Sequence, residues 1–153
     1  MQFQRIIGRG DSEKIYLVVL NTDAATLTTG LGACYLGGLA AETASADGSS
    51  VSASTIGRWP GFVGIAAGDI PSNTAGRLLC WGVANSVLLS AEADKTVGLN
   101  AITYLSPSAV AGQMTSTLTA QAVSTLLGKY IYNLATTNIS GGLNYTKAMV
   151  RAI

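Results

Sequence analysis

The chain contains no histidine, and this absence removes most common catalytic arrangements. Histidine is the usual general base, a frequent metal ligand, and the partner of nucleophilic Ser and Cys residues. Two cysteines are too few for a zinc site without histidine. Neither a GxxxxGK[ST] nor a GxGxxG phosphate-binding motif occurs. The sequence therefore predicts a protein that is not an enzyme and that holds no metal or cofactor.

Charge is also scarce. Charged residues make up 11% of the chain, against about 25% in soluble domains. Nine Lys and Arg residues against eight Asp and Glu residues leave a net charge of +1, so we expect no nucleic-acid partner. A neutral surface rich in hydroxyl groups does not rely on charge repulsion to stay monomeric. We expect the protein to pack against protein neighbours, and a soluble monomer is the alternative.

The two cysteines, Cys34 and Cys80, lie in strand-like segments far apart in the sequence. Disulfide frameworks need several cysteines in a short secreted chain, so we expect two buried free thiols, with a disulfide between them as the alternative. Residues 96–128 carry no charge, yet many Ser, Thr and Gln residues interrupt them. This segment is therefore not expected to span a membrane, and no membrane partner is predicted.

Short apolar segments recur at regular spacing and are separated by turn residues such as those at 21–23, 69–73 and 92–95. This rhythm is typical of a sandwich or barrel, so we predict an all-β fold, a compact barrel or sandwich, with one domain over residues 11–153. Residues 42–54 are expected to form a hairpin tip or loop, and a helix over 109–127 is the alternative to strand there. The expected strands cover 15–20, 26–36 (broken at Gly30 and Gly32), 61–66, 77–83, 87–90, 101–105, 113–119, 128–134 and 145–153.

A faint internal repeat accompanies these strands. Residues 28–33 (TTGLGA) resemble 96–101 (TVGLNA), and the pair Tyr35-Leu36 recurs as Tyr104-Leu105. A glycine after threonine suits a bend where a strand enters a barrel rim. The repeat predicts two similar half-barrels. One inserted residue is needed to align the copies, so chance similarity is the alternative.

Residues 1–10 look like an extended N-terminal arm, because they are short and interrupted by glycine. Such a segment is expected to be mobile in the free protein and to order where its backbone gains a strand partner from another sheet. Its apolar side chains have no evident partner, and its arginines can bind carboxylates. The predicted partner-binding residues are Phe3, Arg5, Ile6, Ile7 and Arg9.

Two further sets of residues suggest other functions. The closely spaced carboxylates Asp11 with Glu13, and Glu92 with Asp94, would suit acid–base chemistry, but they lie beside lysines in turns where solvated charge is usual. The tryptophans, Trp59 and Trp81, would suit a carbohydrate platform, although packing in a core or interface is the stronger interpretation.

The middle of the chain resembles small virion proteins of tailed phages. The similar residues are 60–66 (PGFVGIA), 69–71 (DIP), Gly76-Arg77 and 81–83 (WGV), followed by 104–106, 111–113 and 148–153. Over residues 15–153 the chain resembles a phage head decoration, or cement, protein of the compact β-barrel kind, while residues 1–10 do not match. The resemblance implies a homotrimer on the outer capsid surface of the virion that contacts the major capsid protein. A tail- or spike-associated module that binds a host surface glycan, and an enzyme using carboxylates, are the alternatives.

Overall fold

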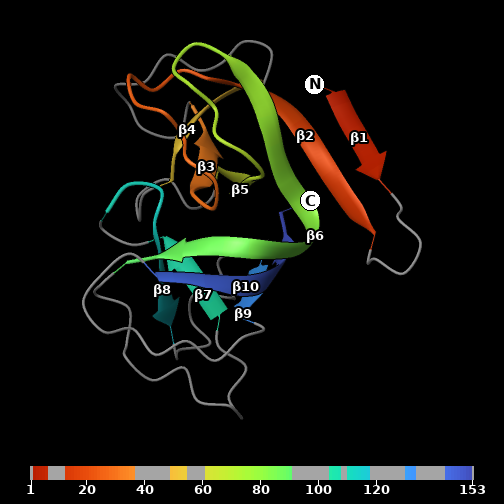
Figure 1. Ribbon diagram of the computed structural model, residues 1–153, viewed down its shortest axis with the longest axis vertical. Helices are drawn as coiled ribbons and strands as arrows, with labels where there is room; N and C mark the ends of the chain where they lie inside the picture. The colour runs from red at the N-terminus through yellow and green to blue at the C-terminus, as the bar shows by residue number, and fades with distance from the viewer. Residues whose placement is uncertain are drawn as a thin grey trace.

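A computed structural model describes residues 2–6, 13–36, 49–54, 61–90, 104–107, 110–117, 130–133 and 144–152 (Figure 1). These residues form strands joined by turns and loops, with no α-helix among them. The strands are β1 (Gln2–Ile6), β2 (Lys14–Asn21), β3 (Gly32–Tyr35), β4 (Ser50–Ala53), β5 (Phe62–Ala66), β6 (Ala75–Leu89), β7 (Tyr104–Pro107), β8 (Met114–Thr117), β9 (Tyr130–Asn133) and β10 (Asn144–Arg151).

The all-β prediction is confirmed. The helix considered for 109–127 is wrong in the described part of that segment, where residues 110–113 form a turn and Met114–Thr117 form β8. The Ser and Thr residues there favour strand, because their hydroxyls compete with helical backbone bonds. Residues 118–127 lie outside the described part. No helix in the described residues has the length and apolar character needed to cross a membrane.

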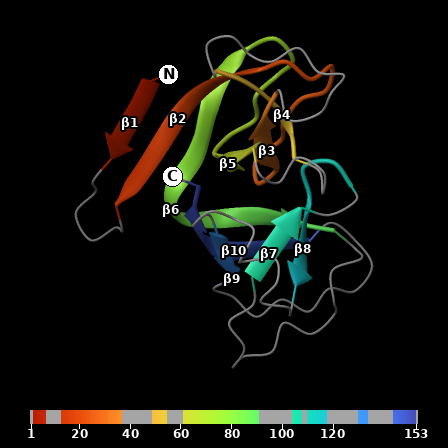
Figure 2. The same cartoon turned by 180° about the vertical axis from the view of Figure 1, so that it is seen from behind.

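The strand pairings close into two rings that share β6. The first ring runs β2-β4-β3-β5-β6 and closes because β6 also pairs with β2. The second runs β6-β8-β7-β9-β10 and closes because β10 pairs with β6. In Figure 1 the first ring lies above the second, and β6 runs through both; Figure 2 shows the same arrangement from behind.

The two rings have the same topology. Strands β2 to β6 of the first ring correspond in chain order to β6 to β10 of the second. In each ring the first and third strands pair in parallel (β2 with β4, β6 with β8), and every other neighbour is antiparallel. The pairing thus confirms the two similar half-barrels predicted from the sequence repeat. Residues 96–101, which carry part of that repeat, lie outside the described residues.

Three strand predictions need correction. Of 26–36, only Gly32–Tyr35 form a strand, β3, while Leu27 makes a single bridge to Ile70. Residues 77–83 and 87–89, expected within separate strands, belong to the single strand β6. The register between β10 and β6 shifts between Thr146 and Ala148, so a β-bulge absorbs the polar residues 85–86 and the strand continues. Within 42–54, expected as a loop, residues Ser50–Ala53 form β4, whose Val51 is fully buried. The small side chains of β4 fit against the neighbouring strands. Residues 42–48 lie outside the described part of the chain.

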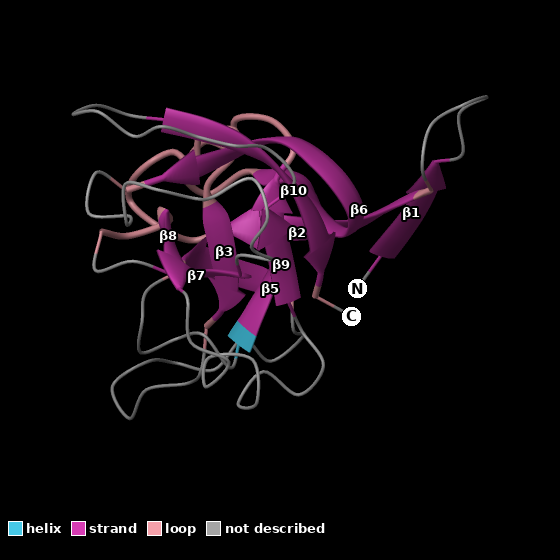
Figure 3. Cartoon of the chain, turned by 90° about the horizontal axis from the view of Figure 1, so that it is seen from below, coloured by secondary structure: helices cyan, strands magenta, loops and turns pink. Residues whose placement is uncertain are grey.

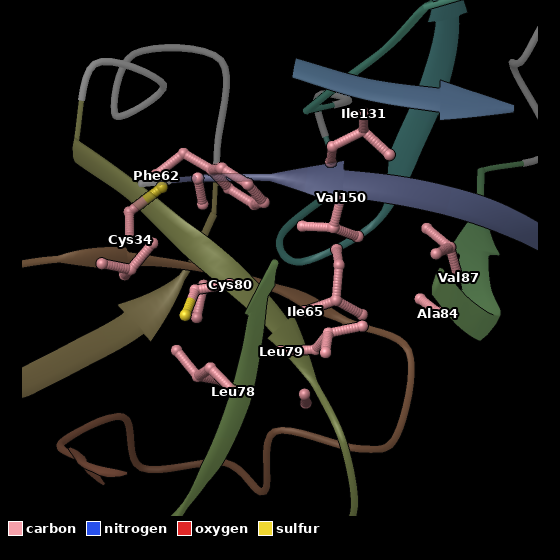
Figure 4. Close-up of a cluster of buried hydrophobic side chains, with 14 of the residues drawn as sticks. Cys34, Phe62, Ile65, Leu78, Leu79, Cys80, Ala84, Val87, Ile131 and Val150 are labelled. Carbon is pink, nitrogen blue, oxygen red and sulfur yellow. The ribbon is translucent and has the colours of Figure 1, made fainter. Parts of the chain in front are cut away.

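One apolar core extends through both rings. Figure 4 shows side chains from each, including Phe62 and Leu78 from the first ring and Ile131 and Val150 from the second. Cys34 and Cys80 are buried in this core as free thiols, which confirms the sequence prediction. The Cys80 thiol lies 3.1 Å from the carbonyl oxygen of Ile15, to which it donates a hydrogen bond, and burial raises its pKa.

Candidate interaction surface

Strand β1 lies outside both rings. It pairs antiparallel with β2, from Gln2 opposite Val18 to Ile6 opposite Lys14, and it ends the order of strands in the sheet. Figure 3 shows β1 at the side of the molecule opposite β7 and β8. From the sequence, this segment was expected to pair with another protein, whereas in the structure residues 2–6 pair with β2 of the same chain.

The structure describes only part of the predicted binding set. Phe3, Arg5 and Ile6 take their place in the β1 ladder opposite Leu17, Ile15 and Lys14, respectively. Their side chains, and all of Ile7 and Arg9, lie outside the described part of the chain. The assignment of these five residues to partner binding therefore stays a prediction.

A polar cluster links β1, β2 and β6 on one face of the sheet. The guanidinium of Arg77 on β6 donates a hydrogen bond of 3.3 Å to the side-chain oxygen of Gln4 on β1. The same guanidinium lies over the Tyr16 ring of β2, 5.5 Å from its centroid. Gln4 and Tyr16 are direct cross-strand neighbours. At an exposed site such a cation–π contact contributes about 0.5–1 kcal/mol. The cluster therefore holds the Gln4, Tyr16 and Arg77 side chains in place more than it stabilises the fold.

An open hollow of about 380 Å³ lies beside this cluster and is lined by residues that include Val18, Asp69 and Arg77. Asp69 accepts hydrogen bonds from the backbone amide of Thr29, at 2.7 Å, and from its hydroxyl, at 2.9 Å. These two bonds lower the pKa of Asp69. The carboxylate is therefore held in its ionised form and fixes the segment around Asp69 to Thr29. A general acid instead needs a raised pKa, so that it carries a proton to donate.

Trp81, one of the two candidate carbohydrate platforms, is partly buried on β6. The guanidinium of Arg151, its cross-strand neighbour on β10, lies over the indole ring at 5.6 Å from the centroid. One ring face is therefore covered by the protein itself, as the packing interpretation expects. Trp59 lies outside the described residues.

The structure does not test the predicted carboxylate pairs, because Asp11, Glu92 and Asp94 lie outside the described residues and only Glu13 lies within them. No group of three or more His, Cys, Asp or Glu residues in the described part of the chain is placed to hold a metal ion. A second hollow, of about 160 Å³, lies where the rings meet, between Lys14 and Tyr16 of β2 and residues 83–86 of β6.

Comparison with protein-family models, with curated proteins and with solved structures found no match for this chain.

The Gln4–Tyr16–Arg77 cluster is the feature that sequence reasoning missed. The alternation within Lys14–Asn21 carried part of the signal, because Leu17 and Val19 are buried whereas Tyr16 and Val18 are only partly so. The position of β1 beside β2 depends on the register between the two strands. No local sequence pattern specifies that register.

Proposed function

We propose that this protein is a virion structural protein that decorates the outer surface of a tailed-phage capsid and stabilises the shell through protein–protein contacts. The observation that supports this most directly is the position of β1. It lies at the end of the sheet, outside two rings that are closed without it. Edge strands offer backbone groups to a further strand, which is a common way for one protein to bind another.

The chemistry of the chain supports the same proposal. A structural protein needs stable contacts and no reacting groups, and the sequence has no histidine and few charges of either sign. Contacts made by backbone hydrogen bonds and small uncharged side chains are weakly screened by salt, unlike contacts between exposed ions. Binding to the capsid should therefore persist at high ionic strength.

The proposed partners are the major capsid protein and two further copies of this chain. Both come from the resemblance, whose residues 62–66, 76–77 and 81–83 fall on β5 of the first ring and on β6, the strand that both rings share. A trimer of this chain would present six rings of like topology. The resemblance implies that such a trimer sits where capsid hexamers meet.

The first experiment mixes the purified protein with capsids that lack it and separates bound from free protein by sedimentation. We expect saturable binding and a higher temperature of capsid rupture. Between 0.1 M and 1 M NaCl the affinity should fall by less than about tenfold, which corresponds to 1.4 kcal/mol. Absence of binding at micromolar concentrations would contradict the proposal.

The second experiment labels the chain in intact particles with an antibody. Label spread over the heads supports decoration. Label confined to the tail tip would favour the glycan-binding module, and it would then be tested by sugar-dependent quenching of Trp fluorescence, with Trp81→Phe as the matched variant.

A further inference from the structure

We infer that β1 is an exchangeable strand: the β1 of one copy of this chain pairs with β2 of a second copy and joins the two. The partner that binds the edge of β2 is thus a second copy of this chain. The inference goes beyond capsid decoration, because it concerns the protein free in solution and needs no capsid.

The fold is complete without β1. Strand β2 pairs with β6 along residues 15–20 and with β4 at residues 20–21, and these pairings close the first ring. The second ring contains neither β1 nor β2. Release of β1 therefore breaks one antiparallel ladder, from Gln2 opposite Val18 to Ile6 opposite Lys14, and leaves both rings closed.

The acceptor strand, β2, already fits the donor strand, β1. Residues 14–18 of β2 match the register of residues 2–6, and Arg77, which lies over the Tyr16 ring, donates a hydrogen bond to Gln4. A β1 from another copy has the same sequence and forms the same bonds. Exchange between identical elements is a low-cost route to oligomers, because the only difference is whether the connection lies within or between chains.

The connection between β1 and β2 is long enough for exchange. Seven residues, 7–13, join β1 to β2, whereas two residues suffice for a tight hairpin. Seven extended residues span about 24 Å, so the acceptor strand of a second copy lies within reach if the two β2 edges face each other. The net charge of +1 opposes the approach of two copies only weakly.

The experiment replaces the two residues of a cross-strand pair by cysteine, one in each of two different chains. Gln4 and Tyr16 lie opposite each other, which brings their Cα atoms to within about 5.5 Å, a separation that a disulfide can bridge. Gln4→Cys is made in a chain carrying a C-terminal mass tag and Tyr16→Cys in an untagged chain. The two are mixed, incubated to allow exchange, and oxidised without capsids. We expect a tagged–untagged disulfide dimer.

The matched control mixes Gln4→Cys with Asn85→Cys, an exposed position on β6 that is not opposite β1. Dimer in the test mixture should exceed that of the control by about tenfold, because only the register pair holds two thiols at bonding distance. The unmodified chain measures background from Cys34 and Cys80, which are buried.

The double variant Gln4→Cys/Tyr16→Cys tests whether β1 stays paired with β2 of its own chain. If it forms only the intrachain disulfide at every protein concentration, and the mixture gives no more dimer than the control, exchange is overturned. An oligomer seen by light scattering in that case uses another surface. Because capsids are absent, failure here leaves the decoration proposal standing, and failure to bind capsids leaves exchange standing. A second pair, Gln2→Cys with Val18→Cys, repeats the test without altering Tyr16.

Discussion

Gly82 lies where β6 passes from the first ring into the second, and its backbone has a φ of +113°. A Cβ at this position would lie 2.5 Å from the carbonyl oxygen of Glu13. We predict that Gly82→Ala lowers the free energy of unfolding by about 1–3 kcal/mol, because both the conformation and the space favour glycine. Urea unfolding measures the change.

The matched control for this substitution is Gly68→Ala. A Cβ at Gly68 meets no atom within 4 Å, so its effect should stay within about 0.5 kcal/mol. Equal effects of the two substitutions would show that the passage of β6 from the first ring into the second does not depend on glycine at position 82.

Asp69 gives stability a specific dependence on pH. Its carboxylate accepts two hydrogen bonds from Thr29, which lower its pKa in the folded protein. The stabilisation is therefore present above the ordinary carboxyl pKa of about 3.9 and is lost as the pH falls through the lower folded-state value. We predict that the melting temperature of Asp69→Ala lies below that of the natural chain at pH 7 and that the gap closes in acid.

Asp69→Asn provides the control for this pH dependence. Its amide oxygen still accepts hydrogen bonds but does not titrate, so the difference in melting temperature between Asp69→Asn and Asp69→Ala should not vary with pH. A gap between the natural chain and Asp69→Ala that is the same at pH 7 and pH 3 would disprove the role assigned to the ionised carboxylate.

At the scale of elements, β1 and the rings are expected to respond differently to truncation. Deletion of residues 1–10 removes β1 and leaves every pairing of both rings in place. We predict that the melting temperature changes by less than about 4 °C, the shift that 1 kcal/mol produces in a chain of this size. Attachment to capsids should weaken. Scanning calorimetry and the sedimentation assay measure the two effects.

Two other outcomes of the truncation are informative. Unfolding of the shortened chain would make β1 an integral strand. Unchanged binding to capsids would show that residues 1–10 are not the tether. Increased aggregation at constant secondary structure is compatible with the prediction, because removing β1 exposes the edge of β2.

Sequence patterns predicted most strands, and the errors have specific physical causes. The continuous apolar segment 62–66 identifies a buried strand well, because every residue of β5 is buried. In 15–20 only Leu17 and Val19 are buried, so one face of β2 packs in the core and the other stays partly exposed. Ser50–Ala53 escaped prediction because serine and alanine are typical of loops, and only the neighbouring strands bury them. The polar residues 85–86 suggested an end of β6, but a bulge accommodates them.

At the scale of the whole molecule, we predict one cooperative unfolding transition, in line with the single domain expected for residues 11–153. The rings share β6 and one apolar core, so neither keeps its closure when β6 unfolds. Calorimetric and van't Hoff enthalpies of unfolding should agree. Two separate transitions, or an unfolding curve by Trp fluorescence that differs from the curve by circular dichroism, would contradict the prediction.

The sequence by itself determined the all-β class and the burial of both cysteines as free thiols, and its internal repeat suggested two similar half-barrels. Each depends on local composition, on spacing or on similarity between segments, all of which are readable along the chain. The tertiary structure alone decided that the half-barrels share one strand, that residues 2–6 lie beside β2, and that Gln4, Tyr16 and Arg77 meet. Those features depend on register between segments as far apart as residues 4 and 77. Register is set by the sum of many cross-strand contacts, and no single stretch of sequence contains that sum.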